Sequence, residues 1–203
     1  HDCSHQEFLR HHMTPSLTKA LIALTLAGGL AACDVTPVRT MWALRNVDPM
    51  TTAPEGIRLA VRIPRGFRPS PDGIALIGEL EASDTVPAET VRFTIERQQK
   101  PNLPSWMRRA DAPLYGYKIA DKDIERFRTY QRVARLAKAE KRGGSISVRT
   151  EIYRLADELP SEILVSVFIK TIEIDDYVPF FEDQDVTEHA SKEDITELVP
   201  LCG

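Results

Sequence analysis

The stretch IRLAVRI occupies positions 57–63 and has the clearest strand pattern in the chain. Its odd-numbered residues are branched and apolar, whereas arginine stands at positions 58 and 62. This two-residue period is typical of a strand with one buried face and one solvated face. We therefore expect the apolar side chains to enter the core, and we expect Arg58 and Arg62 to face water.

Four further segments have the composition of strands, at positions 74–82, 90–97, 145–154 and 162–172. The sequence PRGFRPSPDG at 64–73 predicts a turn, so the first three strands predict an antiparallel meander. Residues 162–172 (EILVSVFIKTI) are almost continuously apolar, which is typical of a central strand. The sequence ADELPS at 156–161 predicts a hairpin between the last two strands.

Residues 121–142 predict a long helix, with Asp121 or Asp123 as its cap and Gly143 as its end. Apolar side chains fall on one half of this helix, so it should cover the sheet. We expect a second, short helix near the C-terminus, capped by Ser191 with Asp194 at the third position. The residues expected to face the sheet are Ile124, Phe127, Tyr130, Val133, Ala134 and Ala137.

Together these elements predict an α+β fold: an antiparallel sheet of about five strands, one long helix packed on a face, and the short C-terminal helix. The alternative is a β-sandwich with an inserted helix. Either fold would form a single globular domain over residues 57–203.

The irregular segment at 98–117 is long enough to be a functional loop. We favour a simpler interpretation, in which Trp106 and Leu114 plug one end of the core.

The chain has 203 residues, is 42% hydrophobic and 28% charged, and carries a formal net charge of −4. These values are typical of globular proteins and give no overall attraction to nucleic acid, so we predict no nucleic-acid partner.

The N-terminal region has the layout of a secretory signal. Met13 is followed by Lys19, an apolar run from Ala20 to Ala32 and then Cys33. The run of about 13 residues is shorter than the roughly 20 that a membrane-spanning helix needs. We predict an upstream segment at 1–12, a signal peptide at 13–32 and a tether at 33–56.

The sequence Leu30-Ala31-Ala32-Cys33 resembles the lipobox of bacterial lipoproteins. The resemblance implies cleavage between Ala32 and Cys33, with acyl chains attached to Cys33, which would anchor the protein in the membrane facing the periplasm. Asp34 resembles the signal that keeps such proteins in the inner membrane. The resemblance covers residues 13–34 only.

Removal of residues 1–32 would leave His189 as the only histidine, with Cys33 and Cys202 as the only cysteines. We therefore predict no metal site and no cofactor. If Cys33 carries no lipid, Cys33 and Cys202 are the obvious disulfide pair. If it does, we expect a reduced Cys202 packed as a small hydrophobic residue.

Three function classes stay open. We favour a lipoprotein that binds or scaffolds an envelope protein or polymer. One alternative is a hydrolase or wall-modifying enzyme using carboxylates of the acidic tail, namely Asp175, Asp176, Asp183 and Asp185; the other is a structural spacer. No motif of a known enzyme class occurs, so we lean against catalysis.

The polar half of the long helix carries Arg128, Arg132 and Arg135. These cations are candidates for contact with anionic lipid headgroups near the anchor. The alternative, which we favour, is a solvated helix face.

Overall fold

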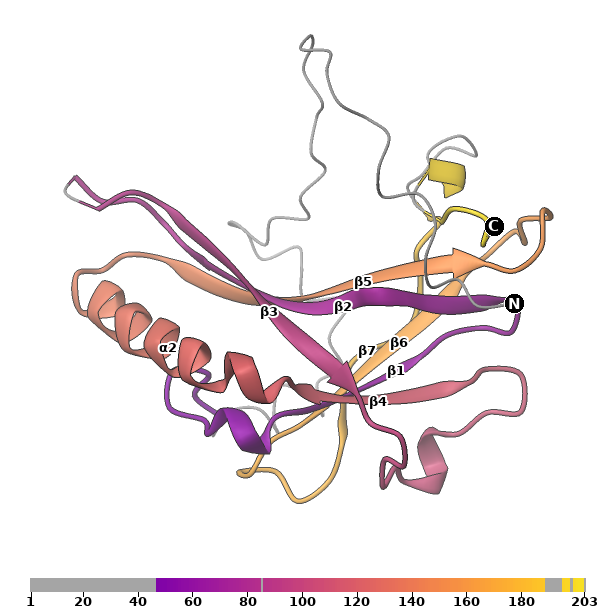
Figure 1. Ribbon diagram of the computed structural model, residues 1–203, viewed down its shortest axis with the longest axis horizontal. Helices are drawn as coiled ribbons and strands as arrows, with labels where there is room; N and C mark the ends of the chain where they lie inside the picture. The colour runs from indigo at the N-terminus through magenta and orange to yellow at the C-terminus, as the bar shows by residue number, and fades with distance from the viewer. Residues whose placement is uncertain (1–46, 85, 189–194, 198, 203) are drawn as a thin grey trace, which may run out of the picture.

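The computed structural model describes residues 47–84, 86–188, 195–197 and 199–202. They form one seven-stranded antiparallel sheet with the order β5-β2-β3-β4-β1-β6-β7. The sheet curls into a half-barrel, and helix α2 lies along one half of it (Figure 1). The strands are β1 (Arg58–Arg62), β2 (Phe67–Leu80), β3 (Glu89–Arg97), β4 (Leu114–Ile119), β5 (Gly144–Arg154), β6 (Leu164–Lys170) and β7 (Val178–Asp185).

The predicted α+β fold with about five strands is wrong, because the described chain is mostly sheet. The sequence analysis missed β4, which is interrupted by a glycine, and β7, which contains a proline and three acidic residues. Glycine, proline and acidic residues are all unfavourable in strands, but β4 also contains two tyrosines and an isoleucine, and β7 is an edge strand, where proline is tolerated. The alternative of a β-sandwich is also wrong, because β3 joins both halves into one sheet by pairing with β2 and β4.

The strand order also differs from the predicted one. Only β2 and β3 of the expected meander pair with each other, while β1 lies between β4 and β6. The predicted hairpin of 145–154 with 162–172 does not form, because β5 pairs with β2 and β6 pairs with β1 and β7. These pairings join segments far apart in sequence, which local turn patterns cannot specify.

Strand β2 extends through the segment that was predicted to be a turn. It pairs with β5 on both sides of an irregularity between Pro69 and Ile74. Asp72 lies within this irregularity and has a φ of 55°. The proline and glycine residues of 64–73 therefore mark a bulge inside one long strand rather than its end.

The long helix is confirmed over most of its predicted length. A short 3-10 helix, η4 (Asp121–Asp123), leads into α2 (Ile124–Ala139). All six residues expected to face the sheet are buried or pack partly buried against the core. Asp123 occupies the N-cap position of α2, as predicted, but its carboxylate makes no capping hydrogen bond to the helix. It instead accepts a hydrogen bond from the Thr94 backbone N–H of β3, at 2.6 Å.

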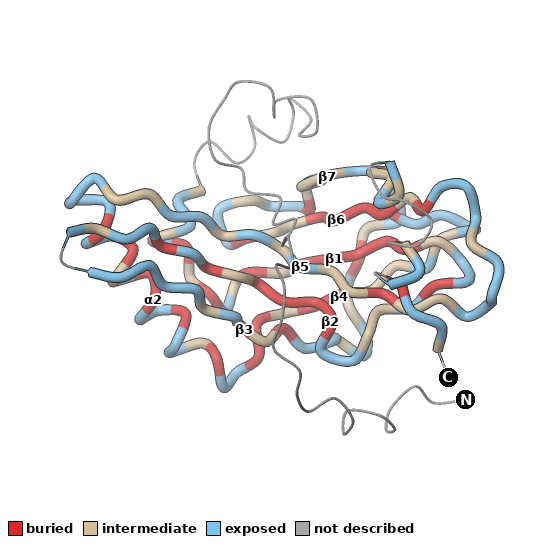
Figure 2. Tube along the Cα trace, turned by 90° about the horizontal axis from the view of Figure 1, so that it is seen from above, coloured by how far each residue is buried: buried red, intermediate tan, exposed pale blue. Residues whose placement is uncertain are grey.

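The main core lies between α2 and the curled sheet. Figure 2 shows buried residues running along β2, β4, β1 and β6. At the helix, the Phe93 ring of β3 packs edge-on against Phe127 and Tyr130, with centroids 4.8 and 5.5 Å apart. The Tyr130 hydroxyl donates toward the backbone carbonyls of Glu79 and Ser145, each at 3.1 Å. Apolar packing and two backbone contacts therefore fix the helix on β2 and β5.

Residues 47–56 also pack against α2. Thr52 is buried, and the buried Gln131 side chain donates hydrogen bonds to the carbonyls of Pro49 and Thr52, each at 2.8 Å. The 3-10 helix η2 (Pro54–Gly56) then leads into β1. The folded body therefore begins before Ile57.

A second apolar cluster covers the opposite face of β1 and β6. It contains Ala60, Leu103, Met107, Phe168 and Tyr177, with Leu114 packed at its side. Because the segment at 98–113 supplies part of this cover, β1 is buried on both faces. The predicted solvated face of β1 is therefore wrong at position 62, where the arginine is 2% exposed.

The interpretation of Trp106 and Leu114 as plugs holds in part. Leu114 packs against this second cluster, but Trp106 is 50% exposed. The Trp106 ring lies edge-on over Phe168, and its N–H donates to the Asp176 carboxylate at 3.3 Å.

The predicted C-terminal helix lies only partly within the described residues. The predicted cap Ser191 and Asp194 lie outside the described residues, although residues 195–197 are helical. Val199 is buried, and Leu201 forms a parallel bridge to Arg154 of β5. Within the described ranges, none of the helices has both the length and the apolar character needed to cross a membrane.

Candidate functional site

Strands β2 and β3 separate partway along their length (Figure 1). They pair from Leu80 and Glu89 as far as Ala75 and Thr94. Beyond that point β2 continues with β5, while the last residues of β3 continue with β4. The sheet therefore forks after the pair Ala75–Thr94, where β2 and β3 separate.

A groove of about 670 Å³ lies at this fork, and we call it the fork groove. This volume lies within the usual range for ligand pockets. One wall comes from the bulge of β2, and the other comes from the end of β3, from β4 and from η4. The lining residues are Pro69, Ser70, Pro71, Asp72, Ile74, Thr94, Ile95, Glu96, Arg97, Tyr117, Ala120, Asp121 and Lys122.

Tyr117 is the most deeply placed polar side chain of the fork groove. The residue is 5% exposed and belongs to the main core, yet it lines the groove. Burial raises the pKa of its hydroxyl to about 12, against an opposing effect of Arg97. The hydroxyl is therefore neutral over the physiological range, and it makes no hydrogen bond to the rest of the described chain. It is available to donate one to a ligand.

The charges around the fork groove are only partly paired. Lys118, on β4, lies 2.8 Å from the Glu96 carboxylate and 2.9 Å from that of Asp121. Hydrogen bonds from the ammonium to Asp121 and Glu96 raise the pKa of Lys118. Arg97 lies over the Tyr115 ring at 4.6 Å, and neither Arg97 nor Lys122 forms an ion pair within the described residues. Two cations of the groove are therefore left for a ligand.

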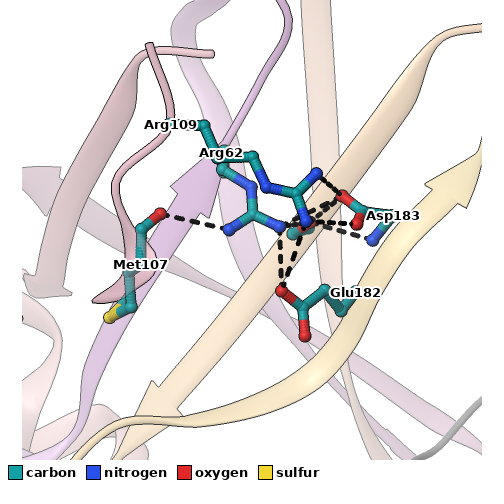
Figure 3. A network of polar contacts seen from close by, with 6 residues as sticks. Arg62, Met107, Arg109, Glu182 and Asp183 are labelled. Carbon is teal, nitrogen blue, oxygen red and sulfur yellow. Dashed lines mark hydrogen bonds and ion pairs between the residues drawn. The ribbon is translucent and has the colours of Figure 1, made fainter. Parts of the chain in front are cut away.

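A second polar site is buried beneath the segment at 98–113. The Arg62 side chain is 3% exposed and lies 3.0 Å from the carboxylates of Glu182 and Asp183 (Figure 3). It also donates to the Met107 carbonyl at 3.1 Å and to the Ser166 hydroxyl at 3.0 Å. Its guanidinium lies 5.1 Å from the Phe168 ring centroid. Arg62 thus links β1 to β6, β7 and the covering segment.

Arg109 completes this cluster from the outside. It donates two hydrogen bonds to the Asp183 carboxylate, at 3.0 and 2.7 Å, and its side chain is 44% exposed. Burial raises the pKa of Asp183, but hydrogen bonds from Arg109 and Arg62 outweigh it, so the net pKa is lowered. Asp183 also has a φ of 52°, in the left-handed region that is uncommon for residues other than glycine.

We call the group Arg62, Arg109, Ser166, Glu182 and Asp183 the polar clamp. Its two cations and two carboxylates balance, and their hydrogen bonds are directed at one another. This arrangement stabilises the covering segment and leaves little capacity for a ligand. Sequence reasoning missed the clamp because Arg62 was assigned to solvent. The sequence held no signal for it, because the position of β1 between β4 and β6 is known only from the structure.

The four carboxylates of the alternative enzyme are not brought together. Asp175 and Asp176 precede β7, whereas Asp183 and Asp185 lie near its end, roughly 20 Å away for an extended strand. Burial raises the pKa of Asp185, but hydrogen bonds from Ile163 and Thr187 outweigh it and lower the net pKa. The pKa of Asp183 is lowered as well, so neither of these two carboxylates has the raised pKa of a general acid. In the described portion of the chain, no group of histidine, cysteine and acidic residues is arranged to hold a metal ion.

The three helix arginines lie on the exposed side of α2, as expected. Arg128 pairs with the carboxylates of Glu125 and Glu55, and Arg135 donates to the Met50 carbonyl at 2.5 Å. Only Arg132 has no ion pair or hydrogen bond to the rest of the described chain. Arg128 and Arg135 therefore help to hold residues 47–56 on the helix.

The predicted lipidation and cleavage residues, Ala32 and Cys33, lie outside the described residues. Cys202 is disulfide-bonded. A reduced Cys202 was expected only for a chain with a lipid on Cys33, and a disulfide was the alternative. The other two cysteines of the sequence are Cys3 and Cys33.

Comparison with protein families, with curated proteins and with solved structures finds no match for this chain.

Proposed function

We propose that this protein is a bacterial envelope lipoprotein whose curled sheet binds a partner in the periplasm. The anchor rests on the sequence Leu30-Ala31-Ala32-Cys33 at the end of a short apolar run. The binding role rests on the fork groove, the one observation of the structure that carries it. The partner is an envelope protein or polymer, and no nucleic acid is involved.

Binding is favoured over hydrolysis by the state of the acidic residues. A carboxylate that acts as a general acid needs a raised pKa. The pKa values of Asp183 and Asp185 are instead lowered, and both side chains are engaged in hydrogen bonds. A spacer without a ligand is disfavoured by the two unpaired cations and the unpartnered Tyr117 hydroxyl in the groove.

The anchor is tested by the intact mass of the protein extracted from bacterial membranes. We expect a chain that begins at Cys33 and carries added acyl mass, because several acyl chains give near-permanent anchoring. A Cys33→Ser variant should move to the soluble periplasmic fraction. The matched Cys202→Ser variant should stay with the membrane.

Two results would contradict the anchor. Thioether and disulfide formation use the same sulfur atom, so a Cys33–Cys202 disulfide in the extracted protein excludes lipidation at Cys33. Retention of residues 1–32, which include Cys3, excludes the processing that lipidation requires. Peptide mapping without reduction distinguishes both results from the expected mass.

The choice of membrane is a finer part of the proposal. Asp34 favours the inner membrane over the outer membrane. Separation of the two membranes by density tests this choice, and an Asp34→Ser variant should shift the protein toward the outer membrane. An unchanged distribution would remove the role of Asp34 and leave the anchor unaffected.

A further inference from the structure

We infer that the fork groove binds an extended peptide segment bearing acidic side chains, which adds as a strand to the free edge of β3. This inference deepens the proposed function, since it assigns a ligand class to the groove on which the binding role rests. It does not depend on the lipid anchor. Strand addition at a sheet edge is a common mode of peptide recognition.

The backbone of β3 supports strand addition. The Thr94 carbonyl accepts a hydrogen bond from Ala120, and the Gln98 N–H donates to Gly116, so both groups turn toward β4. Backbone groups alternate in direction along a strand, and the N–H and C=O of Arg97 therefore turn away from β4, toward the groove. No second strand pairs with Arg97 on that side in the described chain.

The fork keeps this edge open. Beyond Ala75 the residues of β2 remain with β5, and a Cβ atom at Gly73 would lie 2.7 Å from the Glu151 carbonyl. The bulge of β2 therefore lies against β5, and its link to β3 is a side-chain hydrogen bond from Arg92 to the Asp72 carbonyl, at 2.6 Å, rather than backbone pairing. An added strand would lie about 4.8 Å from β3, and the fork groove of about 670 Å³ is lined by the last residues of this strand.

Side chains of the fork groove favour an acidic ligand. Lys118 pairs with both Glu96 and Asp121 but offsets the charge of only one of them. With Arg97 and Lys122, this wall therefore has three cations against two carboxylates, a net charge of +1. Arg97 and Lys122 line the β3 side of the groove, where they can pair with carboxylates of the ligand. The Tyr117 hydroxyl supplies one further donor from a site that is largely shielded from water. Asp72, on the opposite wall, leaves the β2 side less favourable for an acidic residue.

The probe is a fluorescein-labelled pentapeptide amide, Val-Glu-Val-Glu-Val, titrated by fluorescence anisotropy into the detergent-solubilised full chain. Two control peptides carry lysine at both glutamate positions or proline at the central valine. We expect saturable binding of the acidic peptide. Proline should abolish it because the central N–H is lost, and lysine should weaken it at least tenfold.

Variants then assign the site. Tyr117→Phe should weaken binding about fivefold, the usual effect of one hydrogen bond, and Arg97→Gln should weaken it about threefold. The matched control Arg132→Gln removes an exposed cation of α2 outside the groove and should leave binding unchanged. Thermal unfolding of each variant confirms that it is folded.

Hydrogen–deuterium exchange locates the peptide directly. Added pairing should slow amide exchange in the segment around Arg97 and leave the edge strand β7 unchanged. Absence of binding, equal binding of the acidic and lysine peptides, or slowing at β7 instead of β3 would each overturn this inference. The intact mass of the membrane-extracted chain is independent of these results, so failure here is distinct from failure of the anchor.

Discussion

The two halves of the curled sheet are covered in different ways. Helix α2 covers β5, β2 and β3 through aromatic and aliphatic contacts centred on Phe93 and Phe127. The segment at 98–113 helps to cover β1 and β6, and there the polar clamp around Arg62 is added to a small apolar cluster. We refer to these as the helix-covered half and the loop-covered half.

This difference shows how a covering segment with little regular structure is held in place on a sheet. A helix presents a continuous apolar stripe, so burial of area is enough to dock it. The segment at 98–113 contains only the short 3-10 helix η3 (Ser105–Met107). Such a segment has no continuous apolar stripe, and its backbone groups need partners. The Met107 carbonyl accepts a hydrogen bond from Arg62. The ion pairs of the polar clamp then fix the position of the segment, which apolar packing alone does not define.

The largest effect should come from the helix-covered half. Phe127→Ala removes a ring that is 1% exposed and packs edge-on against Phe93, so we expect a loss of about 4 kcal/mol in the free energy of unfolding. Urea unfolding followed by circular dichroism measures this loss. A cost below about 1 kcal/mol would show that the helix is not docked through this ring.

The next effect should come from the loop-covered half. Arg62→Met fills similar space but leaves Glu182 and Asp183 without their buried partner, and we expect a loss of about 3 kcal/mol. In the double variant with Asp183→Asn, the combined loss should be smaller than the sum of the single losses. Strict additivity of the two losses would contradict the polar clamp.

A smaller effect is expected where the helix approaches the sheet most closely. A Cβ atom at Gly78 would lie 2.5 Å from the ring of Tyr130, and that ring is held by two hydrogen bonds to backbone carbonyls. Gly78→Ala should therefore cost about 2 kcal/mol through overpacking. A matched double variant with Tyr130→Leu, which removes the ring, should recover part of this loss. If it recovers none, the close approach is not the cause.

The smallest effect concerns pH and separates the two halves. The pKa of Asp183 is lowered from its ordinary value of 3.8, so its contribution to stability is complete above pH 3.8 and is lost as the pH falls through the lowered value. The stability difference between the wild type and Asp183→Asn should therefore shrink on acidification. The difference between the wild type and Phe127→Ala should stay constant. Urea unfolding at several pH values measures both differences.

The helix and its buried face could be predicted from the sequence because the spacing of Phe127, Tyr130 and Ala134 is a local property. Five of the seven strands were located for the same reason, although the start of β2 was placed too late. Strand β7 was missed because its proline and acidic residues are tolerated only at a sheet edge. Its position at the edge is decided by its neighbours and is invisible in the local sequence.

The candidate site could not be predicted from local sequence patterns. Arg97 and Tyr117 lie in different strands, and they reach one groove only because β3 leaves β2 and continues with β4. Arg62 was misplaced because a two-residue period shows which side chains share a face but not whether that face is covered.

By itself, the sequence determined the long helix, its apolar side and the approximate positions of five strands, because such periodicity depends on neighbours in the chain. The lipobox resemblance was likewise readable, as a motif of four consecutive residues. Tertiary structure alone decided the order of the strands, the fork between β2 and β3, and the burial of Arg62. Each of these depends on contacts between distant segments, which form only when the sheet assembles.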